Sequence, residues 1–132
     1  AVPRLPDEPG PRLREIRRHA DGELLRLTGP RIEEVQVPGL LVNDVPAARR
    51  IIRRAARRAD LVVCAIHAGA EGTSALHLTG GEEIYLGEDR GNPEAFAHMA
   101  VDAGADLVLG SGPHVLRGME VYHRRLIAYS LG

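Results

Sequence analysis

Two histidines and a glutamate stand where apolar runs of the sequence end. His67 closes the run LVVCAIH, Glu71 follows four residues later, and His114 comes shortly after the run DLVLG, in a stretch rich in Gly and Pro. Imidazole and carboxylate groups are typical ligands of divalent transition metals such as Zn, Mn or Fe. Two such ions about 4 Å apart activate water and stabilise a phosphoryl transition state. These residues indicate either a metal-assisted catalytic site or, as the plainer alternative, hydrogen bonds that only anchor two loops.

A polar cluster, GEDRGN at residues 87–92, precedes a predicted helix. Its Arg90 has a planar guanidinium that suits a carboxylate or phosphate, and the helix N-terminus adds backbone N–H donors. The alternative is a capping loop in which Asp89 and Arg90 pair with each other. His77, His98 and His123 are predicted to lie on surfaces or helix faces, although the Gly-rich loop around His77 keeps that residue a further candidate.

Two helices and two strands must position these groups. NDVPAARRIIRRAARRAD carries a capping Asn43 or Asp44, Pro46 in the first turn and an apolar stripe repeating every four residues, so it predicts a helix whose six arginines face solvent. NPEAFAHMAVDAG predicts a second helix, capped by Asn92 and stopped by Gly104. LVVCAIH and DLVLG predict strands buried on both faces. Parallel strands of an open α/β sheet carry ligand sites at their carboxyl ends, so His67 and His114 are expected at one edge.

The C-terminal segments MEVY and RLIAYSL predict two further strands, joined by a tight turn at His123 and Arg124. In MEVY, polar Glu120 and Tyr122 alternate with apolar residues, which predicts one polar face and one buried face formed by Met119 and Val121. The order of helices and strands indicates an α/β fold in which a sheet packs under helices.

Composition limits the classes of function. The 132 residues, 44% of them hydrophobic, suffice for one domain or for part of a larger one. A net charge of −1 and only 3% aromatic residues argue against nucleic-acid partners. The lone Cys64 is expected to be a small buried hydrophobe, and the apolar runs fall short of the ~20 residues of a membrane helix. The segment is therefore predicted to be soluble, and because it opens without Met we interpret it as a fragment or a processed piece.

The ordered segments ADLVVCAIHAGAE and VDAGADLVLGSGPHVLRGMEVYHRRLIAYSLG resemble the C-terminal half of the bacterial capsule-synthesis CapA family, also called poly-gamma-glutamate biosynthesis proteins. The resemblance runs roughly from residue 44 to residue 132. His67, Gly69 and Glu71 match the family's His-x-Gly-x-Glu, and Pro113 and His114 match the end of Gly-His-His-Pro-His. Residues 129–132 match its Tyr-Ser-Leu-Gly. The family is similar to calcineurin-like metallophosphoesterases.

The resemblance implies a fold, a site and a function. The fold would be a partial metallophosphatase-like layered sandwich, with a poorly defined leading region at residues 1–42 and a motif-bearing α/β core at residues 43–132. His67, His114 and Glu71 would be catalytic, with the two histidines beside a pair of divalent ions (Mn, Zn or Fe) in the complete protein. Arg90 and Ser111 would bind substrate. The implied function is capsule or poly-gamma-glutamate biosynthesis; the alternatives are phosphoester hydrolysis and non-catalytic binding of an anionic polymer.

Two departures from the family pattern bear on activity. Ser111 and Gly112 stand where the family has two further histidines, and the motifs of its N-terminal half are missing. The resemblance therefore implies that this segment alone is inactive, and that hydrolysis belongs to a full-length protein in which the N-terminal half of the domain completes the site. It implies an anionic small molecule or acidic polymer as the ligand. The resemblance does not define the cellular location. It allows a full-length protein that is membrane-anchored or extracytoplasmic and belongs to a membrane-associated biosynthetic complex.

Overall fold

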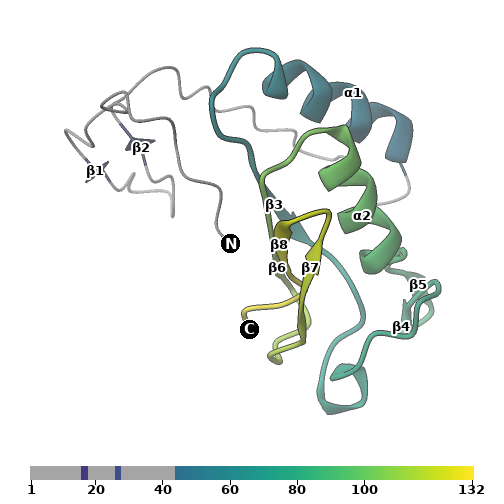
Figure 1. Cartoon of the computed structure of the whole chain (residues 1–132). Coiled ribbons are helices and arrows are strands. Elements are labelled where there is room, and N and C mark those ends of the chain that lie inside the picture. The colour runs from purple at the N-terminus through teal and green to yellow at the C-terminus, as the bar shows by residue number, and fades with distance from the viewer. Residues whose placement is uncertain (1–15, 18–25, 28–43) are drawn as a thin grey trace.

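The computed structural model describes residues 16–17, 26–27 and 44–132 of the chain (Figure 1). Strands β1 (Ile16–Arg17) and β2 (Arg26–Leu27) pair antiparallel. Apart from these two strands, the leading region predicted at residues 1–42 lies outside the described residues, as does the alternative helix cap at Asn43. No helix in the described part of the chain is long and apolar enough to cross a membrane.

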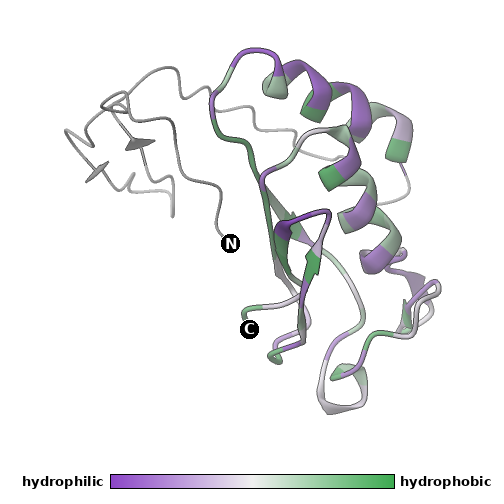
Figure 2. Cartoon of the chain, in the orientation of Figure 1, coloured by the Kyte–Doolittle hydropathy of each residue, from purple (hydrophilic) through white to green (hydrophobic). Residues whose placement is uncertain are grey.

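The first helix, α1 (Val45–Ala56), begins after Asp44 and has a proline in its first turn, as predicted. Its inner side is apolar, with Ala48 and Ile52 buried in the core. The six arginines at positions 49, 50, 53, 54, 57 and 58 are all exposed, which confirms the predicted solvent face. Figure 2 shows the hydrophilic and hydrophobic residues alternating along this helix.

The second helix, α2 (Pro93–Ala103), has the predicted signals at both ends. The Asn92 side chain accepts a hydrogen bond of 2.9 Å from the backbone N–H of Ala95, which satisfies one of the free donors at the helix start. Gly104 ends the helix with a φ of +114°. A Cβ at Gly104 would lie only 2.7 Å from the Cβ of Ala56, so glycine also lets the ends of the two helices approach closely.

A four-stranded sheet lies against these helices, in the order β3 (Val63–His67), β6 (Leu107–Ser111), β8 (Arg125–Ala128) and β7 (Met119–Tyr122). Strands β3, β6 and β8 are parallel, and β7 is antiparallel to β8. On the helix side, Val108 and Ile127 are fully buried in a core that also holds Ile52 and Phe96. The α/β prediction is confirmed, with both helices on one face of a mixed sheet (Figure 1).

Two small elements lie between β3 and α2. A short 3-10 helix spans Thr73–Ala75, and the hairpin of β4 (Ile84–Tyr85) and β5 (Glu88–Asp89) holds residues of the predicted polar cluster. The β7–β8 hairpin turns at His123 and Arg124, as predicted. Both residues have positive φ, +46° and +67°, as a primed two-residue turn requires.

The sheet face opposite the helices differs from the prediction. Along β3, Val63, Ala65 and His67 are exposed while the residues between them face the core, so the prediction that LVVCAIH is covered on both faces is wrong. The reason is the architecture, because both described helices pack on the same face of the sheet and none of them covers the other face of β3. The central strand β6 is better covered, with Val108 buried.

The faces of β7 are reversed relative to the prediction. Met119 and Val121 are 69% and 71% exposed, whereas Glu120 and Tyr122 are half-buried. Tyr122 stacks on the ring of His98 in α2 at 4.0 Å, and the Glu120 carboxylate contacts the same imidazole. The polar residues of β7 therefore face the helix because α2 offers them a partner.

Candidate functional site

The loops that follow β3 and β6 lie side by side. His67 and Ser111 are paired in the parallel register of the two strands. Beyond them, the Ala68 N–H donates to the Ser111 carbonyl at 3.0 Å, and the Gly72 N–H donates to the Pro113 carbonyl at 2.9 Å. The expectation that both loops reach one edge of the sheet is confirmed.

Glu71 contacts two other predicted site residues. His114 Nδ1 lies 3.2 Å from Glu71 Oε2, and Arg90 Nη1 lies 3.5 Å from Glu71 Oε1. Glu71 therefore joins the β6 loop to the segment before α2. The guanidinium of Arg90 also pairs with Glu88 at 3.0 Å and lies over the ring of Tyr85.

The backbone at His114 holds its side chain in an unusual position. Its φ is +55°, a left-handed conformation that non-glycine residues adopt infrequently, although histidine tolerates it better than most. The imidazole is exposed to solvent, and it contacts the Glu71 carboxylate there. This geometry leaves Nε2 as the atom available to a ligand.

His67 lies in a second contact group, with the two residues that depart from the family pattern. Its Nδ1 is 3.4 Å from Ser111 Oγ, which donates to the Ile66 carbonyl at 3.3 Å. A Cβ at Gly112 would come within 3.1 Å of the His67 ring. The predicted residues therefore form two groups, His67 with Ser111, and His114 with Glu71 and Arg90.

The donor types suit Zn, Mn or Fe, because imidazole and carboxylate are their common ligands. Zinc sites in proteins use three or four protein ligands. Within residues 44–132 and the two described strands before them, no group of three or more His, Cys, Asp or Glu side chains is arranged to hold an ion. The role of His67 and His114 as metal ligands thus remains a prediction.

A buried ion pair beneath the site was missed by sequence reasoning. Arg117 and Glu83 are almost completely buried and pair through two hydrogen bonds, of 3.0 Å to Oε1 and 2.9 Å to Oε2. Both residues also bind the backbone of Ala70, which donates its N–H to Glu83 Oε2 at 2.7 Å and accepts from Arg117 Nη2 at 3.0 Å. No spacing in the sequence connects positions 83 and 117, so no local signal indicated the pair.

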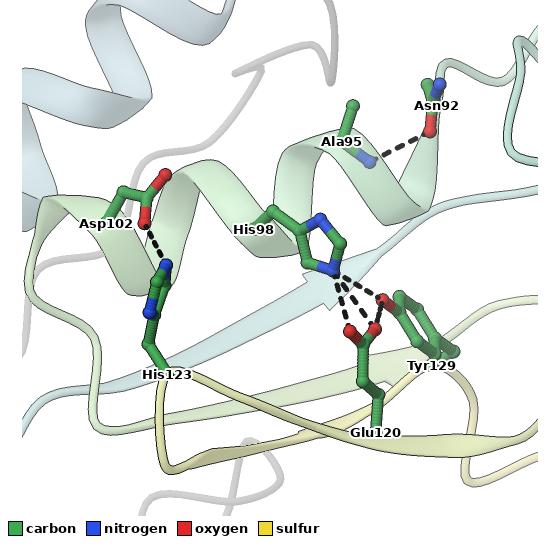
Figure 3. A network of polar contacts seen from close by, with 7 residues as sticks. All are labelled: Asn92, Ala95, His98, Asp102, Glu120, His123 and Tyr129. Atoms are coloured by element: carbon green, nitrogen blue, oxygen red, sulfur yellow. Dashed lines mark hydrogen bonds and ion pairs between the residues drawn. The ribbon is translucent and has the colours of Figure 1, made fainter.

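A third polar network links α2 to the β7–β8 hairpin (Figure 3). The Tyr129 hydroxyl donates to Glu120 Oε2 at 2.5 Å, and His98 Nε2 lies 3.0 Å from the same oxygen. The hydrogen bond from Tyr129, and after it the one from His98, lowers the pKa of Glu120. Burial, and after it the contact with Glu120, raises the pKa of Tyr129. His123 lies 3.9 Å from Asp102. His98 and His123 are therefore on a helix face and at a turn, as predicted.

Together these features define an α/β fold with a cluster of histidine and carboxylate side chains at the carboxyl edge of its parallel strands. Residues 12–132 match the family described as bacterial capsule synthesis protein PGA_cap, and the chain belongs to this family.

Several relatives extend the match. An uncharacterized protein of Sinorhizobium fredii, y4sH, is 33% identical over 94% of this chain. The PGA biosynthesis protein CapA of Bacillus subtilis is 35% identical over 72% of it, and the capsule biosynthesis protein CapA of Bacillus anthracis is 40% identical over 56%. The aligned residues make up 24%, 22% and 15% of these three relatives, so the chain spans about a quarter of their length or less.

Proposed function

We propose that the chain supplies part of a metallophosphatase-like site to a CapA-like protein of capsule or poly-gamma-glutamate biosynthesis. The contact between Glu71 and His114 carries this proposal, because it joins the two family motifs across neighbouring loops. The names of the two CapA relatives support the biological setting.

The residues suggest a division of roles. A His114 Nδ1–H that donates to Glu71 fixes the tautomer in which Nε2 has its lone pair free for a ligand. Arg90, anchored by Glu71 and Glu88, offers a guanidinium to a phosphate or carboxylate. A bound divalent ion would supply an activated water and positive charge. His67 and His114 are the candidate metal ligands, Glu71 would orient His114, and the remaining ligands would come from outside the described residues.

Metal binding by the full-length protein tests the site. We expect Mn²⁺ or Zn²⁺ to be retained after dialysis by the wild type and to be lost at least tenfold more readily by His67→Ala and His114→Ala. His123→Ala serves as the control, because it removes a histidine at the β7–β8 turn. Equal metal content in all four proteins, measured by mass spectrometry, would remove the site assignment.

Turnover separates catalysis from binding. If the site hydrolyses phosphate esters, a generic aryl phosphate should be cleaved in a metal-dependent way by the full-length protein, and His114→Ala should abolish cleavage. Absence of turnover with Mn, Zn and Fe would count against the hydrolase.

A second candidate, non-catalytic binding of an acidic polymer, is favoured by the geometry around Gly112. With φ at +113° and the His67 ring 3.1 Å from its would-be Cβ, this position does not accept the histidine of the family pattern without displacing His67. The candidate predicts that wild-type protein binds poly-gamma-glutamate without cleaving phosphate esters, and that Arg90→Gln weakens binding. Arg53→Gln, on the solvent face of α1, is the matched charge control. Equal binding by both variants would argue against it.

A further inference from the structure

The Glu83–Arg117 pair lies below the loop that carries His67 and Glu71. Each partner binds a different backbone group of Ala70, so both the N–H and the carbonyl of this residue are held. Ala70 immediately precedes Glu71 in the chain. A rigid peptide unit at this point limits where the Glu71 carboxylate can lie relative to His114, 3.2 Å away.

The main chains of the two paired residues also bind two neighbouring segments. The Glu83 N–H donates to the Gly91 carbonyl, and the Arg90 N–H donates to the Glu83 carbonyl, both at 2.8 Å. On the other side, the Arg117 N–H donates to the Ser130 carbonyl at 3.1 Å. The pair therefore connects the His-x-Gly-x-Glu loop, the segment of Arg90 and the C-terminal Tyr-Ser-Leu-Gly.

The free-energy cost of burying the Glu83–Arg117 pair points to a role beyond packing. Removing two charges from water costs several kcal/mol, and replacing such a pair with apolar residues is often neutral or stabilising. Here the Arg117 side chain is 0% exposed and the Glu83 side chain 4%, and Arg117 Nε has no hydrogen-bond partner. A planar fork with several fixed donors can orient a carboxylate and a peptide carbonyl together, which an apolar contact cannot do.

We infer that Glu83 and Arg117 are positioning residues that set Glu71 against His114 and beside Arg90. Both side chains are buried, and both act through the backbone of Ala70. The functional meaning rests on the proposed site, but the positioning itself is a property of the folded chain and can be measured without any activity.

Amide hydrogen exchange and histidine NMR in the full-length protein test the inference. In Glu83→Gln, we expect the Ala70 amide to exchange at least tenfold faster and the side-chain ¹⁵N signals of His114 to shift, with α2 amides changing less than twofold. Arg117→Lys keeps the charge but loses the fork, and should give the same local pattern. The control is Arg125→Gln, which breaks a 2.7 Å pair with Asp106 at the opposite end of β6.

The outcomes are distinct. Local exchange and His114 shifts in both variants, absent from the control, support positioning whether or not the wild type proves to bind metal. Unchanged Ala70 and His114 signals in folded Glu83→Gln and Arg117→Lys would overturn it. If the wild type is active, an unchanged kcat in both variants would overturn the inference as well, while leaving the proposed site intact.

Discussion

At the residue scale, Gly69 explains why the motif His-x-Gly-x-Glu has glycine at its centre. Its φ is +98°, and a Cβ there would lie 2.9 Å from Arg117 Nη1 and 3.0 Å from Glu83 Oε2. Two separate requirements therefore apply, a left-handed backbone and space for the buried pair. Gly72 in the same loop shares the first requirement, with φ at +86°, but no atom lies within 4 Å of its would-be Cβ.

These two glycines form a matched comparison. We expect Gly72→Ala to lower the free energy of unfolding by about 1 kcal/mol through backbone strain alone. Gly69→Ala should cost roughly 2–4 kcal/mol, because the new methyl group also displaces a buried charge. Urea denaturation measures both. Equal losses would mean that the Glu83–Arg117 pair yields to the methyl group without cost, which contradicts the close packing of the loop.

Cys64 provides a prediction about pH. Burial raises the pKa of its thiol from 9.0 to about 11. At pH 8 the thiolate is then about 100-fold rarer than in the unfolded chain, and reaction with a disulfide reagent should slow by about that factor. The folded chain keeps a proton that the unfolded chain loses, so this contribution to stability declines as the pH rises from about 9 toward 11. Native labelling within tenfold of the rate in urea would show that the thiol is accessible.

At the scale of elements, the network of His98, Glu120 and Tyr129 fastens α2 to the β7–β8 hairpin (Figure 3). Hydrogen bonds from Tyr129 and then from His98 hold the pKa of Glu120 below its usual 4.5. A carboxyl group whose folded-state pKa is depressed stabilises the fold at neutral pH. That contribution is lost as the pH falls below about 4.5 through the folded-state value.

Replacing Glu120 tests this attachment. Glu120→Gln should reduce the free energy of unfolding by about 1 kcal/mol at pH 7, since a charged acceptor becomes a neutral one. At a pH well below 4.5 the difference from wild type should shrink, because the wild-type carboxyl takes up its proton as the pH falls through its folded-state pKa. Glu82→Gln, on an exposed residue, is the control and should have little effect at either pH. If the difference in unfolding free energy between wild type and Glu120→Gln stays constant with pH, Glu120 contributes through packing and not through its charge.

The elements also show which parts of the fold the sequence predicts. Both helices were predictable because their caps and apolar stripes are local, as Asn92 and Gly104 illustrate. The convergence of the His67 and His114 loops followed from the rule for parallel strands. The orientation of β7 was not predictable, since alternation defines two faces but not which one meets a helix. The Glu83–Arg117 pair joins segments 34 residues apart, and such contacts leave no periodic signal.

At the scale of the molecule, helices cover one face of the sheet and apolar side chains occupy the other. In the register of the sheet, Val63 is opposite Leu107, Leu107 opposite Leu126, and Leu126 opposite Val121. Val63, Leu126 and Val121 are each more than 40% exposed. A row of this kind across four strands is unusual for a solvated face, which in an antiparallel or mixed sheet normally carries polar residues.

The two faces should therefore respond differently to the same loss of methyl groups. Ile127 is fully buried against the helices, so Ile127→Ala should cost about 2–5 kcal/mol through lost burial and the cavity left behind. Val121→Ala, on the 71% exposed position, should cost less than about 1 kcal/mol, because little apolar area returns to water. Urea denaturation of the 132-residue chain and of the full-length protein measures both changes. If the loss at Val121 approaches the loss at Ile127 only in the full-length protein, additional polypeptide buries this face in that protein. The same large loss in the 132-residue chain would contradict the exposed sheet face itself.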